Sequence, residues 1–430
     1  IGSVVIENNL IAEVLNDEQM PSQPCDEVID AAGLFLLPGV IDTHVHFRDP
    51  GMTQKADFHS ESAAAVAGGV TSICDMPNTL PQTTTLEALE EKFTLMGERS
   101  LVNYSCYFGA TNTNYKLFQA LEGKPICGIK VFMGASTGNM LVDRRRTLEE
   151  IFNGTDFLIA THCENNDEVN KNRKFYLEQE NQTDDLPLSF HPLIRSEEAC
   201  FQSTALAIEL ANQANAKLHV LHLSTAKELQ LFSPAPIEQK RITAEVCVGH
   251  LLYSDKDYAT LGTQIKCNPA IKTEQDKIAL RKAINSGIID SIATDHAPHL
   301  PKDKEGGALK AASGIPTLQY SLVNMLELVS EGEFSIETVV EKMCHAPAKI
   351  YQIKDRGFIK EGYAADLVLV NPKKEWVVTS DNVLSKCGWT PFEGNTYHWA
   401  VEKTFVNGNL LYSNNQVLTT HKGEPLAFNR

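Results

Sequence analysis

The middle of the chain alternates eight times between a short apolar run and a stretch with helical spacing of its apolar residues. Such apolar runs are typical of parallel strands that are covered on both faces. The predicted strands are residues 40–46, 70–76, 103–109, 128–132, 156–161, 216–223, 242–248 and 288–294. The clearest predicted helices are residues 58–67, 85–96, 196–212 and 274–286. Eight such units over roughly 300 residues predict an α/β fold, a (β/α)8 barrel of the TIM type.

Both ends of the chain have a different pattern. Short β-prone runs separated by turn residues occur at residues 2–7, 10–14, 365–370 and 401–406. The asparagines after the first of these runs favour a tight turn and hence a hairpin. We therefore predict that residues 1–38 and 355–430 form one small β-sandwich domain beside a catalytic barrel of residues 39–354.

Polar residues occur where the predicted barrel strands end, which is where the active site of a TIM barrel forms. The candidates for metal binding are His44, His46, Lys130, His162, His222 and Asp295. Packing alone would not place four histidines, a lysine and an aspartate at the ends of five strands. The pattern therefore predicts one metal site at the barrel mouth.

The first strand supplies the most specific part of this pattern. Side chains alternate along a strand, so His44 and His46 point to the same side of its tip. Two neutral imidazoles placed in this way can bind one metal ion. Arg48 follows in the loop, and its planar guanidinium matches the geometry of a carboxylate.

Each of these residues also has an ordinary structural interpretation. His162 or His222 alone is more often a hydrogen-bonded core histidine than a ligand. Lys130 could extend its amine to solvent, and Asp295 could cap the helix that follows. These explanations are independent of one another, whereas a single metal site accounts for all six residues together.

Lys130 stands inside the apolar run Gly128-Ile129-Lys130-Val131-Phe132. A buried ammonium is costly and would repel a nearby cation. Reaction of the neutral amine with carbon dioxide gives a carbamate, which is an anionic carboxylate on a long stem. Such a group can bridge two metal ions about 3.5–4 Å apart.

Two motifs identify a resemblance to a known family. They are His44-Val45-His46-Phe47-Arg48-Asp49-Pro50-Gly51 and Met76-Pro77-Asn78-Thr79. With them, the chain resembles the cyclic amidohydrolases of the amidohydrolase superfamily, and within these the dihydroorotases. The resemblance extends over nearly the whole chain.

The resemblance implies a role for each candidate. His44, His46 and Asp295 would hold one divalent ion and His162 and His222 a second, with carboxylated Lys130 between them. The ions implied are Zn²⁺. The residues implied to contact substrate are Arg48, Asn78 and His299, which hold its carboxylate, and Asn268, which faces its ring.

The activity implied is the reversible cyclisation of N-carbamoyl-L-aspartate to L-dihydroorotate and water. Two metals lower the pKa of a bridging water so that hydroxide can attack the ring amide. Asp295 would move the proton between this hydroxide and the ring nitrogen. One alternative is a hydantoinase, a dihydropyrimidinase or an allantoinase, whose substrate rings have no carboxylate that would need Arg48. The other is an inactive relative that acts as a scaffold.

Two segments depart from the family pattern. Cys247-Val248-Gly249-His250 stands where Cys-Pro-His-His is usual, which leaves the role of His250 open. Residues 311–314 replace a usual Ala-Pro-Phe-Gly. Many members with these motifs have an aspartate in place of Lys130, so the lysine places the chain in a branch that also contains the hydantoinases.

Composition limits the partners of the protein. The net charge of −17 argues against nucleic acid and anionic membranes, so local cations must capture an anionic substrate. Ten cysteines without a Cys-x-x-Cys pair fit a reducing cytoplasm. The polar segment 300–313 is expected to be a mobile loop over the barrel mouth. The oligomeric state, a homo-oligomer included, and any residues before Ile1 stay open.

Overall fold

An eight-stranded parallel sheet forms the centre of the computed structural model, which describes residues 1–134 and 139–430. The strands are paired in chain order, each with its neighbours in the sequence. They are β4 (Val40–Val45), β5 (Val70–Asp75), β6 (Asn103–Gly109), β7 (Gly128–Phe132), β8 (Ile159–His162), β9 (Leu218–Val220), β10 (Ile242–Cys247) and β11 (Ser291–Ala293). Apart from the first residue of β10, every residue of these strands is buried.

The sheet closes on itself between β11 and β4. The His46 amide donates to the His296 carbonyl oxygen at 2.8 Å, and Val45 and His296 form a parallel bridge. Beside this bridge, the Thr294 hydroxyl donates to the buried Asp42 carboxylate at 2.6 Å. A side-chain hydrogen bond thus helps to join the first and last strands of the barrel. The predicted barrel is confirmed.

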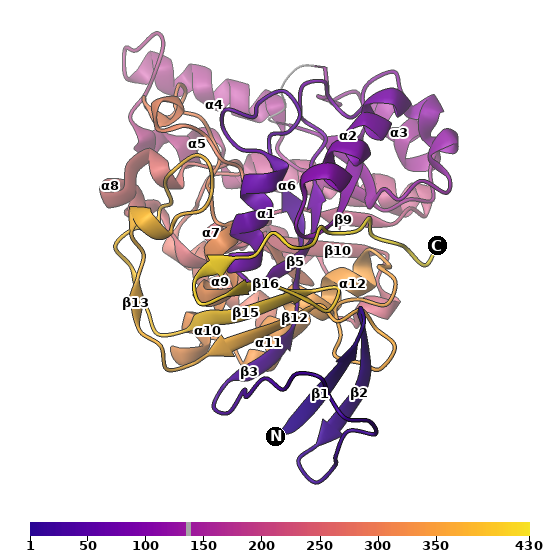
Figure 1. Cartoon of the computed structure of the whole chain (residues 1–430). Coiled ribbons are helices and arrows are strands. Elements are labelled where there is room, and N and C mark those ends of the chain that lie inside the picture. The colour runs from indigo at the N-terminus through magenta and orange to yellow at the C-terminus, as the bar shows by residue number, and fades with distance from the viewer. Residues whose placement is uncertain (135–138) are drawn as a thin grey trace.

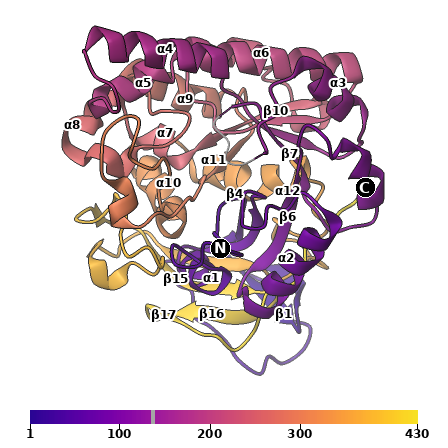
Figure 2. The ribbon, with the colours of Figure 1, turned by 90° about the horizontal axis from the view of Figure 1, so that it is seen from above.

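Helices lie around the strands, as the view from above shows (Figure 2). The longer ones are α1 (Phe58–Ala67), α2 (Leu86–Arg99), α3 (Arg145–Asn153), α4 (Asn166–Gln179), α6 (Glu197–Ala214), α9 (Glu274–Asn285) and α10 (Ser321–Ser330). The start of α1 is fixed by Asp57, whose carboxylate accepts the Ser60 amide at 2.8 Å. Its end is followed by Gly69, whose φ of 79° is favourable only for glycine. The predicted helix over residues 58–67 is confirmed.

The predicted strand boundaries are accurate for β6 and β7 but too wide for β9 and β11. The apolar runs continue to Leu223 and Thr294, whereas the ladders end at Val220 and Ala293. Just beyond the ladders, His222 and Asp295 have left-handed backbone conformations with φ of 41° and 49°. A strand cannot continue through such a residue, and β9 ends at Val220, three residues before its predicted end. The prediction for β11 is one residue too long at its end and begins three residues too early.

The two ends of the chain form antiparallel sheets beside the barrel (Figure 1). The hairpin of β1 (Gly2–Glu7) and β2 (Leu10–Asn16) turns at Asn8. A five-stranded sheet has the order β17 (Gln416–Val417), β16 (Asn409–Ser413), β15 (Ala400–Val406), β12 (Leu367–Asn371), β3 (Phe35–Pro38). The N-terminal β3 therefore pairs with the C-terminal β12, and the fold class is confirmed. The domain boundaries stay a prediction, since only Gly39 separates β3 from β4.

The C-terminal region also contacts the barrel. The Thr404 hydroxyl of β15 donates to the Val66 carbonyl oxygen of α1 at 2.7 Å. The Tyr104 amide of β6 donates to the Glu424 carbonyl oxygen at 2.9 Å. The segment around Trp389 reaches the loop at the barrel mouth separately, where the Trp389 indole N–H donates to the His299 carbonyl oxygen at 2.7 Å.

The loop of residues 300–313 is held by a buried lysine. The Lys304 ammonium donates to the carbonyl oxygens of Ala312 and Gly314, both at 2.8 Å, and of Lys266 at 3.1 Å. The loop backbone is thus tied to the neighbouring Lys266 segment. The mobility expected of this loop stays a prediction.

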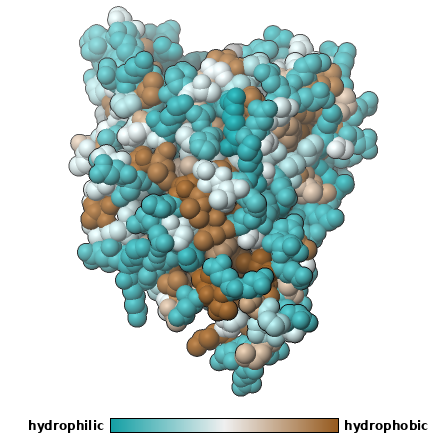
Figure 3. All heavy atoms as spheres, in the orientation of Figure 1, coloured by the Kyte–Doolittle hydropathy of each residue, from teal (hydrophilic) through white to brown (hydrophobic). Residues whose placement is uncertain are grey.

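The surface is mainly polar on the face shown in Figure 3, with apolar side chains gathered below its centre, over the antiparallel strands of Figure 1. Phe35 of β3, with 42% of its surface exposed, is the most exposed large apolar residue of the five-stranded sheet among the described residues. No helix within residues 1–134 and 139–430 is long and apolar enough to cross a membrane.

Candidate functional site

The histidines of the first strand converge on the aspartate of the last. His44 Nε2 lies 3.2 Å and His46 Nε2 lies 3.0 Å from the same oxygen, Oδ1 of Asp295. The two imidazoles therefore point to one side, as the spacing predicts. The barrel seam is what brings Asp295 beside them, because β4 and β11 are neighbours only in the closed sheet.

The other two histidines form a second pair next to the first. His162 Nδ1 lies 2.9 Å from His222 Nε2, and the rings of His44 and His222 have centroids 5.3 Å apart. His44, His222 and Asp295 each offer one potential ligand atom, and these three atoms lie within 4.8 Å of one another. The structure thus brings five of the six predicted metal ligands into a single cluster.

Acceptors behind the first pair fix which ring nitrogen faces the cluster. Glu245 Oε1 lies 2.7 Å from His44 Nδ1, and Asn78 Oδ1 lies 2.8 Å from His46 Nδ1. An oxygen acceptor requires an N–H on the nitrogen it contacts. When either ring is neutral, its lone pair is on Nε2, directed at Asp295 and the cluster, which is the arrangement that metal-binding histidines use.

The second pair is oriented in a similar way. Glu164 Oε2 accepts from His162 Nε2 at 2.8 Å and from the Arg195 guanidinium at 2.6 Å. The lone pair of His162 is then on Nδ1, facing His222. His222 Nδ1 is buried and has no hydrogen-bond partner in the described part of the chain. The neutral imidazoles therefore offer lone pairs that a divalent cation would satisfy.

The electrostatics also favour a cation among these side chains. Burial alone would lower the pKa of His44, but Asp295 and Glu245 raise it to about 9. Burial would raise the pKa of Asp295, but His44 and His46 hold it well below its usual value. Burial would likewise raise the pKa of Glu245, and His44 is the main cause that lowers it to about 2. Both carboxylates are therefore ionised, and the position between them and the imidazoles attracts positive charge.

Lys130 is buried in β7, with 1% of its surface exposed. Its ammonium lies 4.6 Å from the centre of the Phe132 ring and has no hydrogen-bond partner among residues 1–134 and 139–430. Burial lowers the pKa of Lys130 to about 8, against the opposing effect of Asp295 and Glu245. An amine with this pKa is partly neutral near pH 8, as a reaction with carbon dioxide requires.

Three site residues, Arg48, His222 and Asp295, have left-handed backbone conformations. Among the described residues other than glycine, positive φ angles occur mostly at asparagine, aspartate and glutamine. The only exceptions in the described ranges are Arg48, with φ of 63°, and His222, with φ of 41°. Strained residues of this kind are enriched at functional sites, and both of these are predicted site residues.

The predicted substrate contacts lie beside the histidine cluster. Arg48 Nη2 is 3.0 Å from His299 Nε2, and Arg48 Nε donates to the Pro298 carbonyl oxygen at 3.1 Å. Asn78 faces His46 through its oxygen. Asn268 Oδ1 is buried without a hydrogen-bond partner in the described ranges. The structure thus joins Arg48 with His299, and the substrate roles of all four predicted residues remain a prediction.

His250, whose role the sequence leaves open, does not join the histidine cluster. Its Nε2 contacts the Pro269 carbonyl oxygen at 3.0 Å, while its Nδ1 is buried without a partner in the described ranges. His250 and Asp295 line the same small cavity, together with Cys267 and Thr317. His250 is therefore near the site but is not oriented by a carboxylate as His44 and His162 are.

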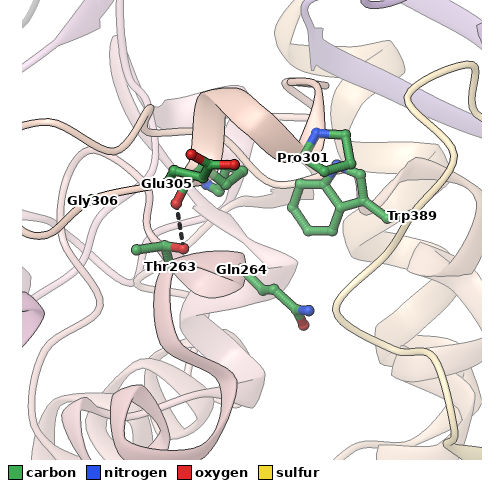
Figure 4. A pocket seen from close by; sticks show the side chains of 7 residues that line it. Thr263, Gln264, Pro301, Glu305, Gly306 and Trp389 are labelled. Atoms are coloured by element: carbon green, nitrogen blue, oxygen red, sulfur yellow. Dashed lines mark hydrogen bonds between the residues drawn. The ribbon is translucent and has the colours of Figure 1, made fainter.

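A larger cleft of about 470 Å³ lies over the loop that contains His299. In Figure 4 the Trp389 indole lies next to Pro301, and Thr263 and Gln264 form another wall. The dashed line marks the hydrogen bond from the Thr263 hydroxyl to the Lys304 carbonyl oxygen, 2.6 Å long. None of the clustered histidines lines this cleft, so the cluster lies outside it.

Sequence reasoning missed the two carboxylates that orient the histidines. Glu245 and Glu164 are both fully buried. Glu245 interrupts the apolar run of β10 just as Lys130 interrupts that of β7, so the same signal could have identified it. Glu164 follows His162 by two residues and could have been found by the alternation that relates His44 to His46.

Comparisons with known proteins place these features in context. Residues 35–411 match the model of the "Amidohydrolase family". The chain is 32% identical over 420 residues to a protein named dihydroorotase from Methanosphaera stadtmanae, covering 97% of this chain and 94% of the relative. It is 35% identical over 393 residues to a dihydroorotase from Methanothermobacter thermautotrophicus, covering 91% and 87%. The fold is similar to that of the L-hydantoinase (dihydropyrimidinase) from Arthrobacter aurescens, with a TM-score of 0.91 and 27% identity over 97% of this chain and 94% of that one.

Proposed function

The chain belongs to the amidohydrolase family, and we propose that it is a metal-dependent dihydroorotase, which interconverts N-carbamoyl-L-aspartate and L-dihydroorotate. The names of its relatives support this activity. The observation that carries it here is the position of Arg48 and His299, 3.0 Å apart, beside the histidine cluster. A ring amide held at the cluster would place its carboxylate against these two residues.

The cluster supports binding of two divalent metal ions, which we propose to be Zn²⁺. His44, His46 and Asp295 would hold one ion, and His162 and His222 the other. Lys130, as a carbamate, would bridge them. The imidazole lone pairs fixed by carboxylates and by Asn78 fit Zn²⁺, which prefers nitrogen ligands oriented in this way.

The residues of the chain then divide the chemistry among themselves. When bound, the metal ions would polarise the ring carbonyl and supply hydroxide near neutral pH. Asp295 would accept a proton during ring opening and return it to the leaving nitrogen, and the reverse during cyclisation. Arg48 and His299 would hold the carboxylate, with Asn78 beside them and Asn268 facing the ring.

A hydantoinase-type activity is the alternative, favoured by the similar fold of the L-hydantoinase and by the lysine in β7. Hydantoin and allantoin rings have no carboxylate for Arg48 and His299. A relative that serves only as a scaffold is disfavoured, because such proteins tend to lose metal ligands and this chain retains all six predicted ones.

Substrate preference tests the proposal. The zinc-loaded protein should cyclise N-carbamoyl-L-aspartate and hydrolyse L-dihydroorotate, with much lower kcat/KM for hydantoin, dihydrouracil and allantoin. A preference for an uncharged ring would favour the hydantoinase alternative. Zinc-dependent binding without turnover of any of these compounds would favour a scaffold.

We also propose that the protein acts in the cytoplasm on a small anionic substrate, without nucleic acid or membrane partners, and that it can form a homo-oligomer. The net charge of −17 supports the exclusion of polyanionic partners. Of the ten cysteines, nine are buried and none is in a disulfide, which suits a reducing compartment.

A further inference from the structure

Lys55 contacts the imidazole of His299 from the side opposite Arg48. Its Nζ lies 3.1 Å from His299 Nδ1 and 3.0 Å from Asp303 Oδ2. About 20% of the Lys55 side chain is exposed, so it reaches inward from the rim of the barrel mouth. Nothing in the proposed mechanism uses Lys55, although it is as close to His299 as Arg48 is.

The contact determines where His299 has its proton. A lysine ammonium can only donate hydrogen bonds, so a hydrogen bond at 3.1 Å requires a lone pair on His299 Nδ1. Burial, then Arg48 and Lys55, lower the pKa of His299 to about 2. The ring is therefore neutral and has one N–H, which the Lys55 contact places on Nε2.

The Nε2–H of His299 is directed at the Ser313 carbonyl oxygen, beside the place where Arg48 offers its own donors. Nε2 lies 3.1 Å from the Ser313 carbonyl oxygen and 3.0 Å from Arg48 Nη2. In this tautomer the contact between Nε2 and Nη2 brings two donors together. Two adjacent donors without an acceptor between them are unfavourable. A carboxylate can accept from both, so this pair of donors suits a bound carboxylate.

The other tautomer would have the opposite consequences. An N–H on Nδ1 would point at the Lys55 ammonium, and Nε2 would accept from Arg48. That pairing would use up an Arg48 donor and leave His299 unable to donate to an anion. Lys55, held by Asp303, makes this arrangement unfavourable.

We propose that Lys55 is a positioning residue that fixes the Nε2–H tautomer of His299 and so makes His299 a second donor to the substrate carboxylate. The inference deepens the proposed dihydroorotase function and rests on it for the identity of the anion. The geometry that determines the tautomer belongs to the protein alone.

The test combines the tautomer of His299 with the kinetics of Lys55→Met. Nitrogen NMR of the zinc-loaded protein, with the His299 signals assigned by their loss in His299→Gln, should show a protonated Nε2 and an unprotonated Nδ1. In Lys55→Met the signals should shift toward a protonated Nδ1. KM for N-carbamoyl-L-aspartate should rise about tenfold, as expected for losing one charge-assisted hydrogen bond, with kcat changed less.

Two further variants separate positioning from a structural role. Lys55→Arg retains a donor and should keep the tautomer and recover most of the loss in KM. Lys124→Met removes an exposed lysine paired with Glu90 at 2.9 Å and should change neither. A wild-type His299 protonated on Nδ1, or a Lys55→Met protein with an unchanged tautomer, would overturn the proposal. The NMR result does not depend on turnover, so failure of the dihydroorotase activity would be seen separately in the substrate assay.

Discussion

His44 is buried and His299 is partly buried at the barrel mouth, with 1% and 13% of their side chains exposed, and their surroundings have opposite charge. Carboxylates contact both nitrogens of His44, through Glu245 and Asp295. Cationic side chains contact both nitrogens of His299, through Arg48 and Lys55. The pKa of His44 is accordingly raised to about 9 against the effect of burial, whereas burial and then Arg48 lower that of His299 to about 2.

This difference shows how one barrel mouth can attract ions of both signs. The environment of His44 favours a cation, and a metal ion can replace the proton that Asp295 and Glu245 stabilise. The environment of His299 has an excess of donors and favours an anion. In a chain of net charge −17, such local separation would allow the proposed anionic substrate to bind beside carboxylates.

The largest effect is expected at the metal-binding cluster around His44, when Lys130 is replaced. Lys130→Ala should lose both metal ions and reduce activity below detection, because the proposed bridge is removed. A small carboxylic acid added to the variant should restore part of the metal content and of the rate. Elemental analysis and the dihydroorotate assay measure both, and a zinc-loaded wild-type protein with a bare amine at Lys130 would contradict the carbamate.

Replacement of Asp295 separates proton transfer from metal binding. Asp295→Asn keeps the shape of the side chain but cannot accept a proton, so both directions should slow by about 10³-fold. The variant should retain more metal than His44→Ala does. Normal cyclisation by a metal-loaded Asn variant would remove Asp295 from the mechanism.

Replacement of Arg48 tests whether the surroundings of His299 bind the substrate carboxylate. Arg48→Met should lower kcat/KM for N-carbamoyl-L-aspartate at least about tenfold, since a charge-assisted hydrogen bond contributes about 1.5–3 kcal/mol. Activity on an uncharged ring should fall much less. Arg145→Met is the control, because Arg145 is 51% exposed and pairs with Glu149 and Glu209. Equal losses on charged and uncharged rings would make Arg48 structural.

The smallest expected effect is on stability in acid. The pKa of His299 is lowered to about 2, mainly by burial and then by Arg48, Lys55 and Lys304. Between about pH 6.5 and this value the unfolded chain takes up a proton that folded His299 does not, so stability falls as pH falls. Metal-free His299→Gln should therefore lose about 1–2 kcal/mol less than metal-free wild type between pH 7.5 and pH 5, measured by denaturant unfolding. Equal losses would contradict the low pKa of His299.

The parts of this structure that follow from local pattern were predictable. The bounds of β6 and β7 and the position of Lys130 follow from apolar runs and their interruption. The end of β9 was predicted three residues too far along, because the left-handed conformation of His222 leaves no trace in hydrophobicity.

The orienting contacts of the site could not be predicted in the same way. Glu245 is 201 residues from His44, and Lys55 is 244 residues from His299. Closure of the barrel and the path of its loops create these pairs. A sequence pattern identifies which residues reach the barrel mouth. The three-dimensional arrangement decides whether each of them lies near His44 or near His299.

The most direct test of the whole account is a zinc titration of metal-free protein followed by dihydroorotate formation from N-carbamoyl-L-aspartate. We expect no activity without metal, a rise in rate with added zinc, and a plateau at two ions bound per chain. Full activity in the presence of a chelator, or two bound zinc ions without any cyclisation, would contradict it.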